Sequence, residues 1–286
     1  MSKKESACDS CPSKSENCEA GCDRKNMIKP QEGIKSVIAV MSGKGGVGKS
    51  TVTALLAGFM AKKGHEVGIL DGDITGPSIP RLLGLKGGRI GAGQRGLIPY
   101  RTELGVKVMS LNLFFEREDE AVIWRGPMLA GAVKQFWEDV DWGELDFLFV
   151  DLPPGTGDVP LTVLQSLPLD GVIIVFSPQD LAIMIVKKAL RMVRTLDVPV
   201  IGFVENMAYL ECPECGKVIY PYGKPKGSQV SEETGVPVLA TLPIQPSYTS
   251  FGDQGKLEML ETPEFEQLAD RLEKVAACGS EAISNN

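Results

Sequence analysis

The sequence predicts an α/β protein with a doubly wound, mainly parallel sheet that carries helices on both faces. Short runs that are apolar throughout alternate with longer segments of helical spacing, which is typical of parallel strands buried on both sides. Glycine is frequent, at 32 of 286 residues, as tight turns between strands and helices require. Hydrophobic residues make up 43% of the chain, which excludes a wholly disordered protein.

The predicted strands are short, apolar and rich in β-branched residues. They span residues 36–42, 66–70, 106–111, 145–150, 171–176, 198–204 and 236–240. Helical spacing is found at residues 50–63, 127–138, 180–195 and 262–277. The first of these helices stops at Gly64 and the second begins with Pro127, a residue favoured at the first helical position. Residues 84–100 hold six glycines and are expected to form a loop or an irregular hairpin.

Composition divides the chain into three parts. Residues 1–33 are rich in Ser, Lys, Glu and Cys, so they cannot bury enough apolar surface to fold alone. We expect a flexible, Cys-rich extension there, or one that a metal organises. Residues 34–277 form the α/β domain, with an insertion at 210–226, and residues 278–286 form a disordered tail.

Residues 43–50, Gly-Lys-Gly-Gly-Val-Gly-Lys-Ser, match the phosphate-binding pattern G-x-x-x-x-G-K-S/T between a predicted strand and a predicted helix. The glycines let backbone N–H groups surround phosphate oxygens, and the helix start adds its positive dipole end. Lys49 would reach the β and γ phosphates, and Ser50 would hold Mg²⁺. The alternative is a glycine-rich turn with a chance lysine. This P-loop predicts that the nucleotide contacts Gly43, Lys44, Gly45, Gly46, Val47, Gly48, Lys49, Ser50 and Thr51.

Acidic residues follow two other predicted strands, at the edge where the P-loop is expected. Asp151 is expected to hold the Mg²⁺ through water, and the N–H of Gly155 to lie on the γ phosphate. Asp73 would orient the attacking water, with a loop-capping carboxylate as the alternative. The sequence therefore predicts a P-loop NTPase.

The formal net charge of −7 argues against a protein that binds nucleic acid or anionic membranes mainly by electrostatics. No apolar run approaches the ~18–20 residues of a membrane span, and the polar start is unlike a secretory signal. We expect a cytoplasmic protein with no nucleic-acid partner and no membrane partner. Seven cysteines in that compartment are metal ligands or bystanders rather than disulfides.

The lysine at position 44 is not required by the general P-loop pattern. With it, the run 44–51 resembles the deviant Walker A loop of the MinD/ParA/nitrogenase-iron-protein group. Four more runs extend the likeness: Asp71-Gly-Asp-Ile-Thr-Gly-Pro-Ser78, Trp124-Arg-Gly-Pro127, Asp151-Leu-Pro-Pro-Gly-Thr-Gly-Asp158 and Cys212-Pro-Glu-Cys215. Over residues 34–275 the chain thus resembles the Mrp/NBP branch, whose P-loop ATPases carry or scaffold iron–sulfur clusters.

The resemblance implies a slow Mg²⁺-ATP hydrolase that acts as a conformational switch within a homodimer. Lys44 would contact the nucleotide of the partner subunit, in a role like that of an arginine finger. Asn206 and the loop at Leu242-Pro243 would flank adenine, which favours ATP over GTP. The expected catalytic residues are Lys44, Lys49, Asp73 and Asp151.

Cys212 and Cys215 have the spacing of metal ligands, and Gly216 follows as in many metal knuckles. Two thiolates complete only half of a four-ligand site. A homodimer would close it, with two cysteines from each subunit around one shared cluster. The resemblance implies a labile, bridging 4Fe–4S cluster, and the alternatives are a zinc knuckle or two structural thiols.

Four further cysteines lie in the extension, at Cys8, Cys11, Cys18 and Cys22. They are enough to close a complete four-cysteine site in one chain. Eukaryotic cytosolic scaffolds of this branch carry an N-terminal cluster, but their usual spacing has a long first gap that this sequence lacks. A second iron–sulfur cluster, a zinc ion and a reduced tail without metal are the three alternatives.

The leading hypothesis is an ATP-dependent homodimeric carrier that passes an iron–sulfur cluster to apoproteins. The main alternative is a MinD/ParA-like partitioning or adaptor ATPase with a structural zinc knuckle. An electron-transfer reductase like the nitrogenase iron protein is a further alternative. That relative bridges its dimer with two well-separated cysteines per chain, which an adjacent pair does not match.

Overall fold

The computed structural model describes residues 30–73, 78–88, 90–114, 126–179 and 182–283. Its parallel strands are β1 (Val37–Met41), β2 (Val67–Asp71), β4 (Lys107–Ser110), β5 (Phe147–Asp151), β6 (Gly171–Phe176), β7 (Val200–Glu211) and β9 (Val238–Pro243). Two short strands are antiparallel to their neighbours: β3 (Tyr100–Arg101) and β8 (Val218–Ile219). Within the described residues, these nine strands form one sheet in the order β3-β4-β2-β5-β1-β6-β7-β8, with β9 paired to β7.

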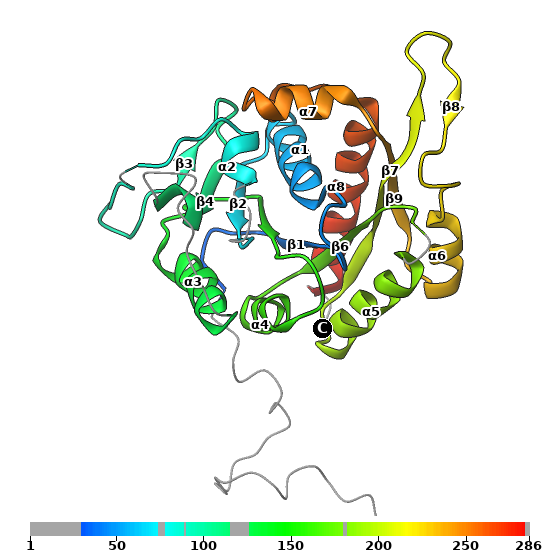
Figure 1. Ribbon diagram of the computed structural model, residues 1–286. Helices are drawn as coiled ribbons and strands as arrows, with labels where there is room; N and C mark the ends of the chain where they lie inside the picture. The colour runs from blue at the N-terminus through cyan, green and yellow to red at the C-terminus, as the bar shows by residue number, and fades with distance from the viewer. Residues whose placement is uncertain (1–29, 74–77, 89, 115–125, 180–181, 284–286) are drawn as a thin grey trace, which may run out of the picture.

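Helices cover both faces of this sheet (Figure 1). One face carries α1 (Lys49–Lys62) and α8 (Pro263–Ile283), and the other carries α3 (Gly126–Asp139), α4 (Asp158–Ser166) and α5 (Ala182–Thr195). The shorter helices are α2 (Ile79–Leu82), α6 (Gly227–Thr234), α7 (Pro246–Asp253), η3 (Leu111–Phe114) and η4 (Leu257–Met259). The doubly wound, mainly parallel α/β fold is therefore confirmed. None of the helices in the described segments has the length and apolar character needed to cross a membrane.

The central strand β1 shows why its residues form a buried strand. Val37, Ala39 and Met41 belong to the hydrophobic cluster under α3, α4 and α5, whereas Ile38 and Val40 belong to the cluster under α1 and α8. Successive side chains of a strand point to opposite faces, so an apolar run serves both clusters at once. Full burial of each large aliphatic side chain contributes about 1.5–3 kcal/mol.

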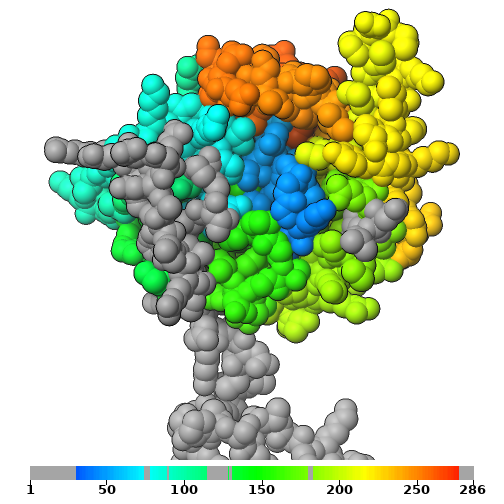
Figure 2. Space-filling model, viewed as in Figure 1, coloured from blue at the N-terminus to red at the C-terminus, as the bar shows by residue number. Residues whose placement is uncertain are grey.

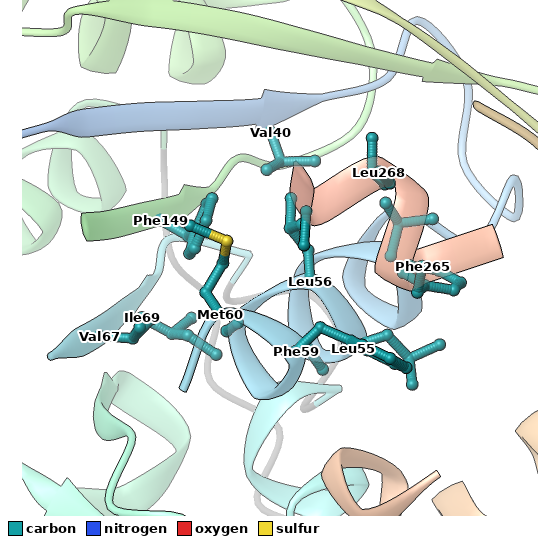
Figure 3. Packing of buried hydrophobic residues seen from close by; sticks show 14 of the residues in the cluster. Val40, Leu55, Leu56, Phe59, Met60, Val67, Ile69, Phe149, Phe265 and Leu268 are labelled. Carbon is teal, nitrogen blue, oxygen red and sulfur yellow. The ribbon is translucent and has the colours of Figure 1, made fainter. Parts of the chain in front are cut away.

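Helix α1 packs on the sheet and is flanked by α8, η4 and α2, which explains why it is buried almost all round rather than along one stripe. Figure 3 shows Leu56 and Met60 of α1 in the same cluster as Val40 of the sheet and Leu268 of α8. The helix that follows the P-loop is thus fixed by packing on two sides, and this packing holds the start of the helix in place.

The strand order places the P-loop at a topological switch point. From β1 the chain moves to β2 and β4 on one side of the sheet, and later to β6, β7 and β9 on the other. Ligands of open α/β sheets bind beyond the carboxyl ends of the strands at such a point. Asp71 and Asp151 end β2 and β5 and are register partners, so the two acidic strand ends meet beside the loop.

Three features differ from the sequence predictions. Strand β7, expected to end at Val204, runs on to Glu211 and pairs with β8 to form a hairpin. This insertion, residues 210–226, is called the arm, and it projects from the body in Figures 1 and 2. Helix α8 continues to Ile283, so residues 278–283 are helical rather than a disordered tail. Helices α4, α6 and α7 were not expected.

Candidate nucleotide cleft and cysteine knuckle

An open cleft of about 640 Å³ lies at the carboxyl end of β1. Among the predicted site residues, its lining includes Gly45, Gly46, Gly48, Lys49, Ser50, Thr51, Asp73, Asn206 and Pro243. Gly43, Lys44 and Val47 line a smaller pocket instead. The fold therefore brings most of the predicted nucleotide contacts together from four separate parts of the sequence.

The P-loop backbone requires glycine at two positions. Gly46 and Gly48 have φ angles of 78° and 81°, in the left-handed region that side chains with a Cβ disfavour. A Cβ on Gly48 would also lie 2.3 Å from Nδ2 of Asn206. Gly48 is the N-cap of α1, and no side chain caps this helix start. Its orphan N–H groups and the dipole of α1 are therefore free to bind an anion.

A buried ion pair lies at the floor of the cleft. Nζ of Lys49 donates to Oδ2 of Asp151 at 2.6 Å and lies 3.6 Å from Oδ2 of Asp73. The same Oδ2 of Asp151 accepts from the Ser50 hydroxyl at 2.6 Å, and Oδ1 accepts from the Thr53 hydroxyl at 2.8 Å. Thr53 is one helical turn after Lys49, and helical spacing alone would have found it. Asp151 thus orients both the cation and the hydroxyl that the P-loop offers to phosphate and metal.

Asp71 is a second buried carboxyl beside this ion pair. Its Oδ1 accepts from the N–H of Asp73 at 3.0 Å, and its Oδ2 accepts from the Ser110 hydroxyl at 2.8 Å. Burial, reinforced by the neighbouring Asp151 carboxylate, raises the pKa of Asp71 well above its usual range. By accepting the N–H of Asp73, the Asp71 side chain shapes the turn that presents Asp73.

Two predicted residues are placed differently from the rest of the site. Lys44 is exposed, and its Nζ donates to Oε1 of Gln179 at 2.8 Å, so it faces away from the cleft of its own chain. The N–H of Gly155, expected on the γ phosphate, donates instead to the carbonyl of Ser42 at 2.8 Å. Contact between Gly155 and a phosphate would require that bond to open.

The opposite end of the cleft is formed by β7, β9 and α7. Nδ2 of Asn206 donates to the Val47 carbonyl at 2.9 Å, which ties β7 directly to the P-loop. Met207 follows with a φ of 58° and also lines the cleft, as do Pro243 and Tyr248. Tyr248 could not be expected, because it comes from α7, which carries no recognisable motif.

The tip of the arm folds as a tight knuckle around Cys212 and Cys215. The N–H of Cys212 donates to the Lys217 carbonyl at 3.0 Å, and the N–H of Gly216 donates to the Cys212 carbonyl at 2.8 Å. Gly216 has a φ of 67°, which explains a glycine after the second cysteine. These contacts close the turn within the arm itself.

The knuckle also tunes its thiols. Hydrogen bonds from the N–H groups of Glu214 and Cys215, and from the Cys215 thiol, lower the pKa of the Cys212 thiol below its usual value. A thiolate is the form that binds metals. Within the described segments, no group of three or more His, Cys, Asp or Glu side chains is arranged to hold a metal ion. The pair therefore offers two ligands, and Cys8, Cys11, Cys18 and Cys22 lie outside the described residues.

Comparisons with known proteins identify the family to which this chain is similar. The family model described as ParA, NUBPL iron-transfer P-loop NTPase, matches residues 33–278. An iron–sulfur cluster carrier protein of Clostridium perfringens is 50% identical over 232 residues, covering 79% of this chain and 81% of that protein. A carrier protein of Methanocaldococcus jannaschii is 41% identical and covers 96% of this chain and 98% of its own.

Solved structures agree with this placement. A nucleotide-binding protein from Archaeoglobus fulgidus in complex with ADP has a TM-score of 0.73 and 45% identity, over 81% of this chain and 90% of that one. The cell division ATPase MinD of Pyrococcus furiosus has a TM-score of 0.63 at 22% identity, over 84% and 99%, which shows the fold alone. The resemblance drawn from the motifs is confirmed: the chain belongs to the ParA family of P-loop NTPases described as NUBPL iron-transfer P-loop NTPases.

Proposed function

We propose that this protein is an ATP-dependent carrier of iron–sulfur clusters that works as a homodimer in the cytoplasm. The observation that carries the proposal is the architecture of β7. This strand contacts the P-loop through Asn206 and ends at a thiol knuckle that begins with Cys212. Nucleotide binding and thiol chemistry therefore share one structural element. The names of the matched carrier proteins support the same function.

The cleft supports binding and slow hydrolysis of ATP. The N–H groups of the P-loop and the Lys49 ammonium would hold the phosphates, and Asp73 would orient the attacking water. Lys44, which faces away from its own cleft, would reach the nucleotide of the partner subunit. Asn206 and Pro243, which line the far end of the cleft, would flank the adenine.

The donor set beside the phosphates fits Mg²⁺. The Ser50 hydroxyl and the Asp151 carboxylate lie 2.6 Å apart, and both are the hard oxygen donors that Mg²⁺ prefers. When bound, Mg²⁺ would neutralise part of the phosphate charge. Ser50 would bind the ion, and Asp151 would hold it through water.

The cargo site is the knuckle of two copies. Cys212 and Cys215 supply two thiolates per chain, so one labile 4Fe–4S cluster shared by two subunits completes four ligands. Cys215 is exposed at the tip of the arm, so a cluster held there would be accessible to apoproteins. Hydrolysis acts as a switch: release of the γ phosphate would change the loops at Asp73 and Gly155 and alter the contact between the subunits. Cys8, Cys11, Cys18 and Cys22 would hold a second cluster or zinc.

Anaerobic reconstitution tests this proposal. The purified protein is incubated with iron and sulfide, and iron, labile sulfide and zinc are quantified per chain. The loaded protein is then mixed with an apo-form of a 4Fe–4S enzyme, and the recovery of that enzyme's activity is followed. We expect the parent protein to bind labile sulfide and to transfer its cluster. In Cys212→Ser/Cys215→Ser, the knuckle should bind no cluster and so transfer none. Stoichiometric zinc without sulfide would contradict the proposal and favour an adaptor ATPase with a zinc knuckle.

A further inference from the structure

The wall of the nucleotide cleft contains a buried serine whose hydroxyl has no partner. Ser42 lies between the end of β1 and the first glycine of the P-loop, and it lines the cleft. The residue is 1% exposed, and its Oγ makes no hydrogen bond with any residue that the structure describes. A buried hydroxyl without a partner is unfavourable, and native proteins pair most such groups. We therefore expect this hydroxyl to bind a group that enters the cleft.

The contacts of the Ser42 backbone show which part of the cleft the residue adjoins. The Ser42 carbonyl accepts the N–H of Gly155 at 2.8 Å, so Ser42 joins the P-loop to the loop that follows β5. That loop begins at Asp151, whose carboxylate accepts from Nζ of Lys49 and from the Ser50 hydroxyl. Ser42 therefore lies at the phosphate end of the cleft, rather than at the end formed by β7, β9 and α7.

The order of groups along the P-loop indicates which phosphate Ser42 meets. The N–H groups of a P-loop surround the α and β phosphates, and its lysine reaches the β and γ phosphates. Ser42 precedes these N–H groups in sequence and is bonded to Gly155, whose loop is expected to meet the γ phosphate. Lys49 and Ser50 are already bonded to Asp151. The γ phosphate is thus the group of the nucleotide that fits the unpaired hydroxyl.

We propose that the Ser42 hydroxyl donates a hydrogen bond to the γ phosphate of bound ATP and so helps the protein to distinguish ATP from ADP. This proposal rests on the ATP-dependent switch proposed above and adds a residue to it. A γ phosphate at this position binds the hydroxyl of Ser42 and competes with the Ser42 carbonyl for the N–H of Gly155. Both effects end when the γ phosphate leaves, so one residue responds to the state of the nucleotide.

Ser42→Ala tests this contact because it removes the hydroxyl and keeps the carbonyl that holds Gly155. The probes are ADP and AMP-PNP, a non-hydrolysable ATP analogue that has a γ phosphate. Their affinities are measured with Mg²⁺ by displacement of a fluorescent nucleotide. Loss of a hydrogen bond to a charged phosphate should weaken AMP-PNP binding about tenfold. ADP affinity should stay within about twofold, because ADP has no γ phosphate.

Ser177→Ala is the matched control. Ser177 is also the first residue after a parallel strand, β6, and it is 4% exposed. It lines the smaller pocket rather than the cleft, so its substitution should change neither affinity. Thermal melting without nucleotide adds an independent readout. Ser42→Ala should melt at or above the parent, because it removes a buried polar group that no described residue pairs.

The outcomes separate this contact from the function on which it rests. Equal losses of AMP-PNP and ADP affinity in Ser42→Ala, or no loss of either, would overturn the contact. A variant that melts well below the parent without nucleotide would also overturn it, because the hydroxyl would then be bonded within the protein. A parent that binds neither nucleotide would contradict the ATP-dependent function and the contact together. A parent that binds both nucleotides but loads no cluster would contradict the carrier function alone.

Discussion

The cleft is stabilised by contacts between distant segments, whereas the arm is stabilised by contacts within itself. In the cleft, Lys49 and Asp151 are buried and joined by hydrogen bonds that cross from the P-loop to β5. At the knuckle, Cys212 is tied to its own turn, and every residue from Pro213 to Pro225 is exposed. The geometry of the nucleotide site is set by the sheet, whereas the geometry of the thiol site is set by hydrogen bonds within the arm. A substitution in one site should therefore leave the other site intact. The exception is β7, because this strand contributes to both sites.

The largest expected effect is the loss of nucleotide function in Lys49→Ala. Removing the cation that faces the phosphates should lower ATP turnover by about 10²–10³-fold. It also leaves Asp151 buried without its partner, which costs about 3–5 kcal/mol of stability. Steady-state hydrolysis and urea unfolding measure the two effects. Lys44→Ala, at an exposed position, is the control for stability, and turnover within threefold of the parent would contradict the assignment of Lys49.

The reciprocal change is Cys212→Ser/Cys215→Ser. It should abolish cluster binding at the arm while Mg²⁺-ATP affinity stays within twofold, because no residue of the knuckle lines the cleft. Labile-sulfide assay and nucleotide titration check the two halves of this statement. A parallel fall in nucleotide affinity would show that the two sites are not structurally independent.

A moderate effect is expected where the two regions meet. Asn206→Ala removes the hydrogen bond to the Val47 carbonyl, and a net loss of about 1 kcal/mol weakens Mg²⁺-ATP binding about fivefold. Titration with a fluorescent ATP analogue measures the change, with Gln229→Ala on the exposed face of α6 as the control. Unchanged affinity would mean that β7 does not support the P-loop.

The smallest effect concerns Asp71. A carboxyl whose pKa is raised by folding destabilises the native state once the pH exceeds its unfolded value of about 3.9. Asp71→Asn, which keeps an acceptor and a donor for its two neighbours, should raise the melting temperature at pH 7 by about 2–4 °C for each 1 kcal/mol relieved. The gain should vanish as the pH falls towards 4. A variant that melts lower than the parent at pH 7 would show that Asp71 is needed in its charged form.

The strands of the sheet could be predicted because each is specified by its own short run of apolar residues. An apolar run such as 171–176 forms a strand over those same residues, Gly171–Phe176, because it has to be buried on both faces. The P-loop was equally visible, since its glycines and its lysine are adjacent in sequence. Roles that depend on such adjacency, including those of Lys49 and Ser50, can be assigned from one sequence.

What escaped prediction depends on contacts between distant segments. The apolar run that predicts β7 ends at Val204, but pairing with β8 extends the strand to Glu211. Asp71 and Asp73 look alike in sequence, and only the register of β2 against β5 buries the first beside Asp151. The hydrogen bond between the N–H of Gly155 and the carbonyl of Ser42 likewise joins segments that are distant in sequence. Such contacts follow from the assembled sheet and have no local signature.

Native mass spectrometry of the anaerobically reconstituted protein tests whether two subunits share one cluster at the arms. We expect a dimer that carries one labile 4Fe–4S cluster at the arms. That cluster should be retained when residues 1–33 are deleted and lost in Cys212→Ser/Cys215→Ser. A cluster or zinc ion held by a monomer through Cys212 and Cys215, or a dimer whose only cluster disappears with residues 1–33, would contradict the shared site at the arm.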